Sequence, residues 1–142
     1  MDKPIQLLLV EDNPGDVRLT QEALKESNAN IDLSIVMDGE EAMNFLKKRG
    51  QYSDVVKPDI VLLDLNLPKK NGLEVLEEIK ADEMLRTIPV IILTTSDAEH
   101  DILKGYSLHA NCFVLKPVDF DEFIKVIGLI NQFWFQTVKL PS

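Results

Sequence analysis

Three carboxylates in this sequence of 142 residues directly follow short apolar runs, at the points where β-strands would end. Glu11 and Asp12 come after the run from Ile5 to Val10, and Asp64 comes after a run that begins at Asp59. Three carboxylates held close together cannot all stay ionised without a counter-charge. Mg²⁺, which prefers oxygen ligands and retains several waters, suits such a group. The residue types and their positions therefore predict a divalent metal site.

A hydroxyl and an amine follow two further apolar runs. Thr94 comes after the run from Ile88 to Leu93, and Lys116 comes after the run from Cys112 to Leu115. A metal, an ammonium, a hydroxyl and a carboxylate at one point are what phosphoryl transfer to a carboxylate requires. In this interpretation Lys116 and the metal neutralise the phosphoryl oxygens, Thr94 donates a hydrogen bond, and Asp64 attacks in line. Each residue alone has an ordinary structural explanation, as a helix cap or a strand end, and only the set indicates chemistry.

Five short apolar runs are the strands that must position these side chains. They are Ile5 to Val10, Ile31 to Met37, Asp59 to Leu63, Ile88 to Leu93, and Cys112 to Leu115. The first, third and fourth are almost continuously apolar, as expected of central parallel strands that helices cover on both faces. Helical patterns lie between the runs. Helices are expected to start at Asp38-Gly39 and Asn71-Gly72, and the pairs Asn71/Glu74 and Asp119/Glu122 have capping-box spacing.

The alternation of strand and helix predicts an α/β fold, a flavodoxin-like doubly wound sheet of five parallel strands in the order 2-1-3-4-5 with five helices. In this order the first and third strands are neighbours, so Glu11, Asp12 and Asp64 should meet at the sheet edge where such folds bind ligands. We expect a single domain over residues 1–142, with a core of about 5–130 and a C-terminal extension at 131–142. The segment from Lys47 to Pro58 is interpreted as a loop and not as a domain linker.

Composition narrows the class of protein. Hydrophobic residues make up 45% and charged residues 27%, which is typical of globular domains. A net charge of −9 disfavours binding to a nucleic-acid backbone, and no apolar stretch is long enough to span a membrane. A single cysteine, Cys112, cannot form an intrachain disulfide. We expect a cytoplasmic protein without nucleic-acid or membrane partners.

The sequence resembles the response-regulator receiver domains of two-component signalling over about residues 5–130. The residues that carry the resemblance are Glu11-Asp12, the segment Asp59 to Pro68 with Asn71-Gly72 after it, Thr94, and Lys116-Pro117. The resemblance implies that Asp64 accepts a phosphoryl group from a sensor histidine kinase in a His-to-Asp phosphorelay. It further implies Mg²⁺ as the cofactor, held by Glu11 and Asp12 together with Asp64 and the backbone carbonyl of Asn66.

The resemblance also assigns a conformational switch. Thr94 would sense the phosphoryl group, Lys116 would pair with it, and Phe113 would be the aromatic that turns inward when Thr94 moves. Catalysis would be limited to phosphoryl uptake and slow autodephosphorylation, so the chain is not expected to be an enzyme in its own right. Output would pass through protein contacts, without a DNA-binding domain.

Two departures and one narrower resemblance concern the ends and loops. The interval from Asp12 to Asp64 is longer than in compact chemotaxis receivers, and we place the extra residues in the loop from Lys47 to Pro58. Thr95, which follows Thr94, stands where the family usually has a smaller residue. The ending, residues 131–142, resembles the tail of the small stand-alone receivers that partner bacterial phytochromes. A phytochrome-type kinase is therefore the expected partner.

The last predicted helix carries two apolar stripes. The first, expected to face the sheet, comprises Phe120, Phe123, Ile124, Ile127, Ile130 and Trp134; the second, on an adjacent face, comprises Val126, Leu129 and Phe133. Together they are wider than the arc that a surface helix needs to bury. We expect a homodimer through the fourth helix, the fifth strand, the fifth helix and the C-terminal aromatic residues. The alternative is that the tail folds back over the second stripe.

Two other functions remain open. One is a metal-dependent aspartyl-phosphate phosphatase, although such enzymes carry a second Asp two positions after the nucleophile, where this sequence has Asn66. The other is a pseudo-receiver that binds partners without being phosphorylated. The intact set of residues argues against it: Glu11, Asp12, Asp64, Thr94 and Lys116.

Overall fold

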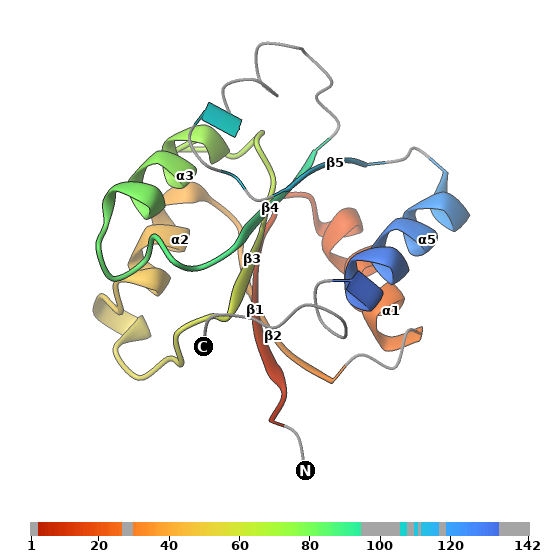
Figure 1. Ribbon diagram of the computed structural model, residues 1–142, viewed down its shortest axis with the longest axis horizontal. Coiled ribbons are helices and arrows are strands. Elements are labelled where there is room, and N and C mark those ends of the chain that lie inside the picture. The colour runs from red at the N-terminus through yellow and green to blue at the C-terminus, as the bar shows by residue number, and fades with distance from the viewer. Residues whose placement is uncertain are drawn as a thin grey trace.

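The computed structural model describes residues 3–26, 30–94, 106–107, 110, 112–116 and 119–133, without the side chain of Phe120. Figure 1 shows a sheet with helices on both sides. The strands are β1 (Ile5–Val10), β2 (Ile31–Val36), β3 (Ile60–Leu63), β4 (Val90–Thr94) and β5 (Cys112–Leu115). The helices are α1 (Pro14–Glu26), α2 (Gly39–Leu46), α3 (Gly72–Ala81) and α5 (Phe120–Ile130), with a short 3₁₀ helix η1 (Gly50–Tyr52).

All five strands are parallel, in the order β2-β1-β3-β4-β5, which confirms the predicted topology. The fourth of the five predicted helices falls between β4 and β5, where residues 95–105 and 108–109 lie outside the described part of the chain. The predicted loop between α2 and β3 contains η1. No helix in the described residues is long and apolar enough to cross a membrane.

Two strand boundaries differ from the prediction at β4. Ile88 is buried but does not belong to the strand, because its backbone N–H donates to the Leu85 carbonyl at 3.0 Å. The strand starts at Val90 and continues through Thr94. The apolar run that starts at Ile88 indicates which residues are buried. The first residue of the strand is set by hydrogen bonding to the neighbouring strand.

The sheet separates two hydrophobic clusters. One lies between the sheet and the pair α2 and α3, and the other between the sheet and the pair α1 and α5, which Figure 1 shows on the opposite side. Alternate residues of the central strands contribute to each cluster: Leu8, Val61 and Ile92 to the first, and Leu7, Leu62 and Ile91 to the second. This is why the central strands read as continuous apolar runs.

Side-chain caps set the helix starts that the sequence predicts. The Asp38 carboxylate accepts a hydrogen bond from the Glu41 backbone N–H at 2.8 Å, and Asn71 forms a reciprocal capping box with Glu74. At α5, Asp119 accepts from the backbone N–H groups of residues 121 and 122. Each cap satisfies backbone donors that the first helical turn leaves without partners.

Helix α5 buries one of its two predicted stripes. Phe123, Ile127 and Ile130 are buried against the sheet, while Leu129 is 64% and Phe133 is 55% exposed. The Phe120 side chain and Trp134 lie outside the described residues, as does the rest of the predicted tail from 134 onward. In the described residues the second stripe therefore ends in two exposed apolar side chains.

Candidate functional site

Backbone hydrogen bonds extend the sheet by one residue beyond three of its strands. The Glu11 N–H donates to the Val36 carbonyl at 3.0 Å, and the Asp64 N–H donates to the Val10 carbonyl at 3.0 Å. The Lys116 N–H donates to Thr94 in the same way, at 2.8 Å. Because all strands run in one direction, these bonds place the three charged residues at one edge of the sheet.

Three carboxylates converge at this edge, as the sequence predicts. One oxygen from each of Glu11, Asp12 and Asp64 lies within 4.8 Å of the others. Glu11 and Asp64 are buried, and Asp12 is more exposed. The donor set is made entirely of hard oxygen atoms, is negatively charged and is open on the Asp12 side, so it fits a divalent cation that keeps some of its waters.

Lys116 reaches into the same group and donates to three carboxylates. Its Nζ lies 2.8 Å from Glu11 Oε2, 2.9 Å from Asp16 Oδ2 and 3.2 Å from Asp64 Oδ2. Lys116 is itself buried. The three contacts use all three donors of the ammonium.

The sequence analysis missed Asp16. It lies in the first turn of α1, and its side chain is only 27% exposed. An acidic residue in that turn suggests no more than a favourable interaction with the helix dipole. Its proximity to Glu11 along the chain is the one signal in the sequence, and that signal does not reveal a contact with Lys116.

Burial and mutual contacts shift two pKa values in this group. Burial raises the pKa of Glu11 to about 8, and its hydrogen bond with Asp64 adds to the rise, while Lys116 opposes it. Burial alone would lower the pKa of Lys116, but hydrogen bonds to Glu11 and Asp16 and the charge of Asp64 raise it above the ordinary lysine value. Lys116 therefore stays positively charged, and Glu11 binds a proton more readily than an ordinary glutamate while no metal compensates its charge.

A tight turn after β3 fixes the position of Asp64 and leads into α3. The backbone N–H of Asn66 donates to Asp64 Oδ1 at 3.2 Å, and the N–H of Gly72 donates to the Leu65 carbonyl at 2.9 Å. A β-carbon on Gly72 would lie 2.3 Å from the Asp64 carbonyl oxygen. Only glycine therefore lets the start of α3 approach the backbone of Asp64 this closely.

The predicted switch residues lie on the last two strands. Thr94 is fully buried at the end of β4, and Phe113 precedes Lys116 by three residues on β5. Phe113 is half-buried against the cluster under α2 and α3, and its ring centroid lies 6.2 Å from that of Tyr106. Thr94 therefore lies at the end of β4, and Phe113 pairs with Ile92, two residues before Thr94 on the same strand.

Comparisons with known proteins agree with this arrangement. Residues 7–128 match the response regulator receiver domain family. The chain belongs to that family. In the receiver fold the acidic and basic residues that follow the strands lie together at one edge of the sheet.

Several receiver proteins are similar over nearly the whole chain. Response regulator Rcp1 of Synechocystis sp. is 47% identical over 139 residues, which cover 98% of this chain and 95% of Rcp1. The crystal structure of the Mn²⁺-bound form of Rcp1 has a TM-score of 0.94 and covers 98% of this chain and all of that one. The phosphorylated cyanobacterial phytochrome response regulator RcpA has a TM-score of 0.95 at 46% identity, covering 98% of this chain and 99% of its own.

Proposed function

We propose that this receiver domain, a single domain over residues 1–142, is the phosphoacceptor of a two-component phosphorelay, with Asp64 as the residue that is phosphorylated. The observation that carries the proposal is the environment of Asp64. Its carboxylate is buried beside two other carboxylates and accepts hydrogen bonds from Lys116 and the Asn66 backbone. A nucleophile next to a fixed cation and a metal-binding group suits phosphoryl transfer.

The metal ligands in this proposal are Glu11, Asp12 and Asp64, with the backbone carbonyl of Asn66 completing the set. Their oxygen atoms and negative charge suit Mg²⁺, and the Mn²⁺-bound form of Rcp1 supports a divalent cation in a similar protein. When bound, the ion would supply positive charge to the phosphoryl oxygens. Because burial raises the pKa of Glu11, a cation would compete with protons for this carboxylate.

The chain's own residues carry the remaining steps. A carboxylate oxygen of Asp64 attacks phosphorus, the bond from phosphorus to the imidazole nitrogen of the kinase histidine breaks, and the nitrogen keeps the electron pair. Lys116, which follows β5, donates to a phosphoryl oxygen, while Thr94 donates from the end of β4, the strand that lies between β3 and β5. Thr94 then moves toward the phosphoryl group, and Phe113 turns into the space that it leaves.

The similar proteins support a sensor histidine kinase as the partner, of the phytochrome type. RcpA is a phytochrome response regulator, and its structure is that of a phosphorylated protein. We propose that this chain works in the cytoplasm and signals through protein contacts. Its catalysis would be restricted to phosphoryl uptake and slow autodephosphorylation.

We also propose self-association through β5, α5 and the fourth predicted helix. Exposed apolar side chains lie on this part of the molecule: Tyr106, Leu115, Leu129 and Phe133. Strand β5 is an edge strand of the sheet, and a two-fold contact would cover both the edge and these side chains. Phosphorylation of Asp64 would change this surface through the movements of Thr94 and Phe113.

Labelling with a small phosphodonor tests the central proposal. The protein is incubated with radiolabelled acetyl phosphate and Mg²⁺, and we expect an acid-stable, base-labile adduct in the wild type and none in Asp64→Asn. Asp54→Asn, an exposed acid in the loop before β3, is the matched control and should label like the wild type. Equal labelling of the wild type and Asp64→Asn, or no labelling of either, would contradict the proposal.

A further inference from the structure

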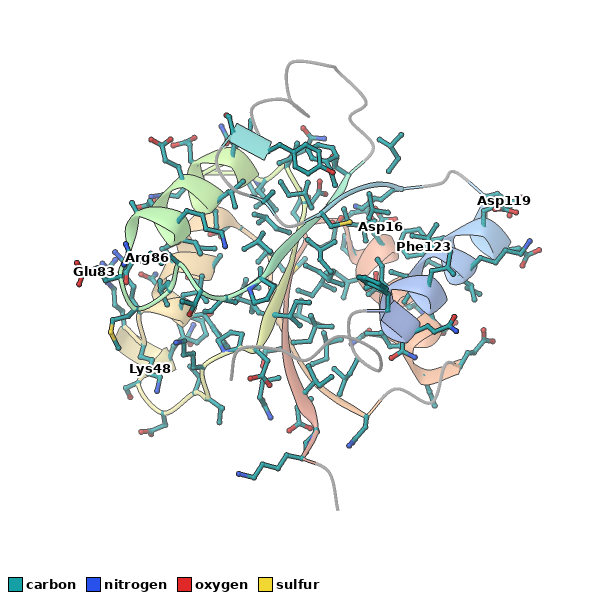
Figure 2. The ribbon with its side chains drawn as sticks, in the orientation of Figure 1. Asp16, Lys48, Glu83, Arg86, Asp119 and Phe123 are labelled. Carbon is teal, nitrogen blue, oxygen red and sulfur yellow. The ribbon has the colours of Figure 1, made fainter. Side chains whose placement is uncertain are left out.

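Asp16 is the member of the charged group that lies on a helix and not at a strand end. Its Oδ2 is 2.9 Å from Lys116 Nζ. Figure 2 shows Asp16 at the start of α1, on the side of the sheet that α1 and α5 cover. The side chain of Asn13 accepts a hydrogen bond from the Asp16 N–H at 3.1 Å, and the Asp16 carbonyl accepts one from Thr20 Oγ1 at 2.8 Å. The backbone of Asp16 is therefore held from both sides.

Asp16 differs from the other two partners of Lys116 in what else it does. Glu11 and Asp64 belong to the group of carboxylate oxygens that lie within 4.8 Å of one another, the proposed metal ligands. Asp16 is not a member of that group. A cation at the site would bind the oxygens of Glu11 and Asp64, and Asp16 would remain as an anionic partner of Lys116.

The distances show how the ammonium is shared. Lys116 Nζ lies closer to Glu11 and Asp16, at 2.8 and 2.9 Å, than to Asp64, at 3.2 Å. A cation among three anions takes a position set by the balance of their attractions, and removing one anion moves it toward the others. Without Asp16, Lys116 would move closer to Asp64 and form a tighter ion pair with the nucleophile.

We propose that Asp16 is a positioning residue that keeps Lys116 in place for the phosphoryl group. Its carboxylate restrains the ammonium from closing on Asp64 before transfer, so that the nucleophile stays available. During transfer it keeps the ammonium beside the site, where a phosphoryl oxygen replaces the Asp64 oxygen as acceptor. This role rests on the proposed function, because it concerns the rate at which Asp64 becomes phosphorylated.

The test compares rates of phosphorylation by acetyl phosphate in saturating Mg²⁺. In this reaction an Asp64 oxygen attacks phosphorus and acetate leaves with the electrons of the broken bond. Asp16→Asn keeps the size of the side chain but removes its charge, and we expect the rate to fall by about ten- to a hundredfold, the effect of one charge-assisted hydrogen bond. Asp16→Glu restores the anion and should return the rate to within about threefold of the wild type.

Asp121→Asn is the matched control. Asp121 also lies in the first turn of a helix, α5, but is exposed and does not contact Lys116. We expect its rate to equal that of the wild type, which separates the contact with Lys116 from a general effect of helix charge. Circular dichroism and urea unfolding of each variant show whether it is folded.

The outcomes separate this role from the proposed function. If the wild type is labelled on Asp64 but Asp16→Asn is labelled at the same rate, the role of Asp16 is wrong and the function stands. Equal slowing of folded Asp16→Asn and Asp16→Glu would also contradict it, because the negative charge would then not be the property that matters. If the wild type is not labelled, the proposed function fails and this role fails with it.

Discussion

Replacing Lys116 by methionine should destabilise the metal-free protein far more than a typical surface substitution would. The Lys116 side chain is 5% exposed, and those of its partners Glu11 and Asp64 are 3% and 8% exposed. Methionine keeps most of the apolar stem and removes the charge. Asp64 is then left buried without its cation, which is the costly way to break an ion pair.

The structure also sets the size of the loss. Removing one partner of a buried ion pair costs about 3–5 kcal/mol of the free energy of unfolding. Burial raises the pKa of Glu11 to about 8, so this carboxyl takes up a proton more readily than an ordinary glutamate and can lose its charge when Lys116 is removed. The charge left without a partner is then mainly that of Asp64. We therefore expect the free energy of unfolding to fall by about 3 kcal/mol, the lower end of the range.

Urea unfolding at pH 7, with EDTA and with saturating Mg²⁺, measures this effect. In Lys116→Met a bound cation replaces part of the lost positive charge, so Mg²⁺ should stabilise the variant more than the wild type. Lys125→Met is the matched control. Lys125 pairs with Glu122 on the exposed face of α5, where the two side chains are 70% and 57% exposed, and its loss should cost less than about 0.5 kcal/mol.

Two results would refute the reasoning on Lys116. A loss below about 1 kcal/mol in EDTA would mean that the carboxylates relax toward water once the cation is gone. A loss that Mg²⁺ does not reduce would mean that Lys116 and the metal do not compensate the same charges.

Two further predictions concern proton binding and self-association. The pKa of Glu11 rises from 4.5 to about 8 on folding, so between these pH values the folded, metal-free protein binds more protons than the unfolded chain. Its free energy of unfolding should therefore fall by a few kcal/mol as pH rises from about 4.5 to about 8, at ~1.4 kcal/mol per pKa unit. Glu11→Gln should flatten this part of a urea-unfolding series in EDTA, and an unchanged slope would mean that another group binds the proton. Sedimentation should show a dimer that Leu129→Glu converts to a monomer while Val56→Glu, another exposed apolar position, does not. A wild-type monomer both with and without a phosphoryl mimic would rule the dimer out.

Much of the candidate site could be predicted because strand ends are visible in the sequence. Glu11, Asp64 and Lys116 each directly follow an apolar run, and the alternation with helices makes the strands parallel. Parallel strands end at the same edge, so the side chains that follow them must meet there. The same logic predicted the strand order and the two-sided burial of the central strands.

The helices were less predictable in detail. The caps at Asp38 and Asn71 were visible as residue types, and the structure confirms both. At α5 the width of the apolar arc indicated that one stripe would remain outside, but burial of Phe123 and exposure of Leu129 depend on how the helix rotates against the sheet. That rotation minimises exposed apolar area over the whole contact and is not a property of the helix alone.

The sequence by itself determined that carboxylates and an ammonium share one sheet edge, because their positions follow from strand direction. Only the tertiary structure decided how Lys116 divides its three hydrogen bonds, and that Asp16 takes one of them. Asp16 projects from α1, so its direction depends on the packing of α1 against the sheet and against α5. A contact between a helix side chain and a strand end a hundred residues away exists only once that packing is complete.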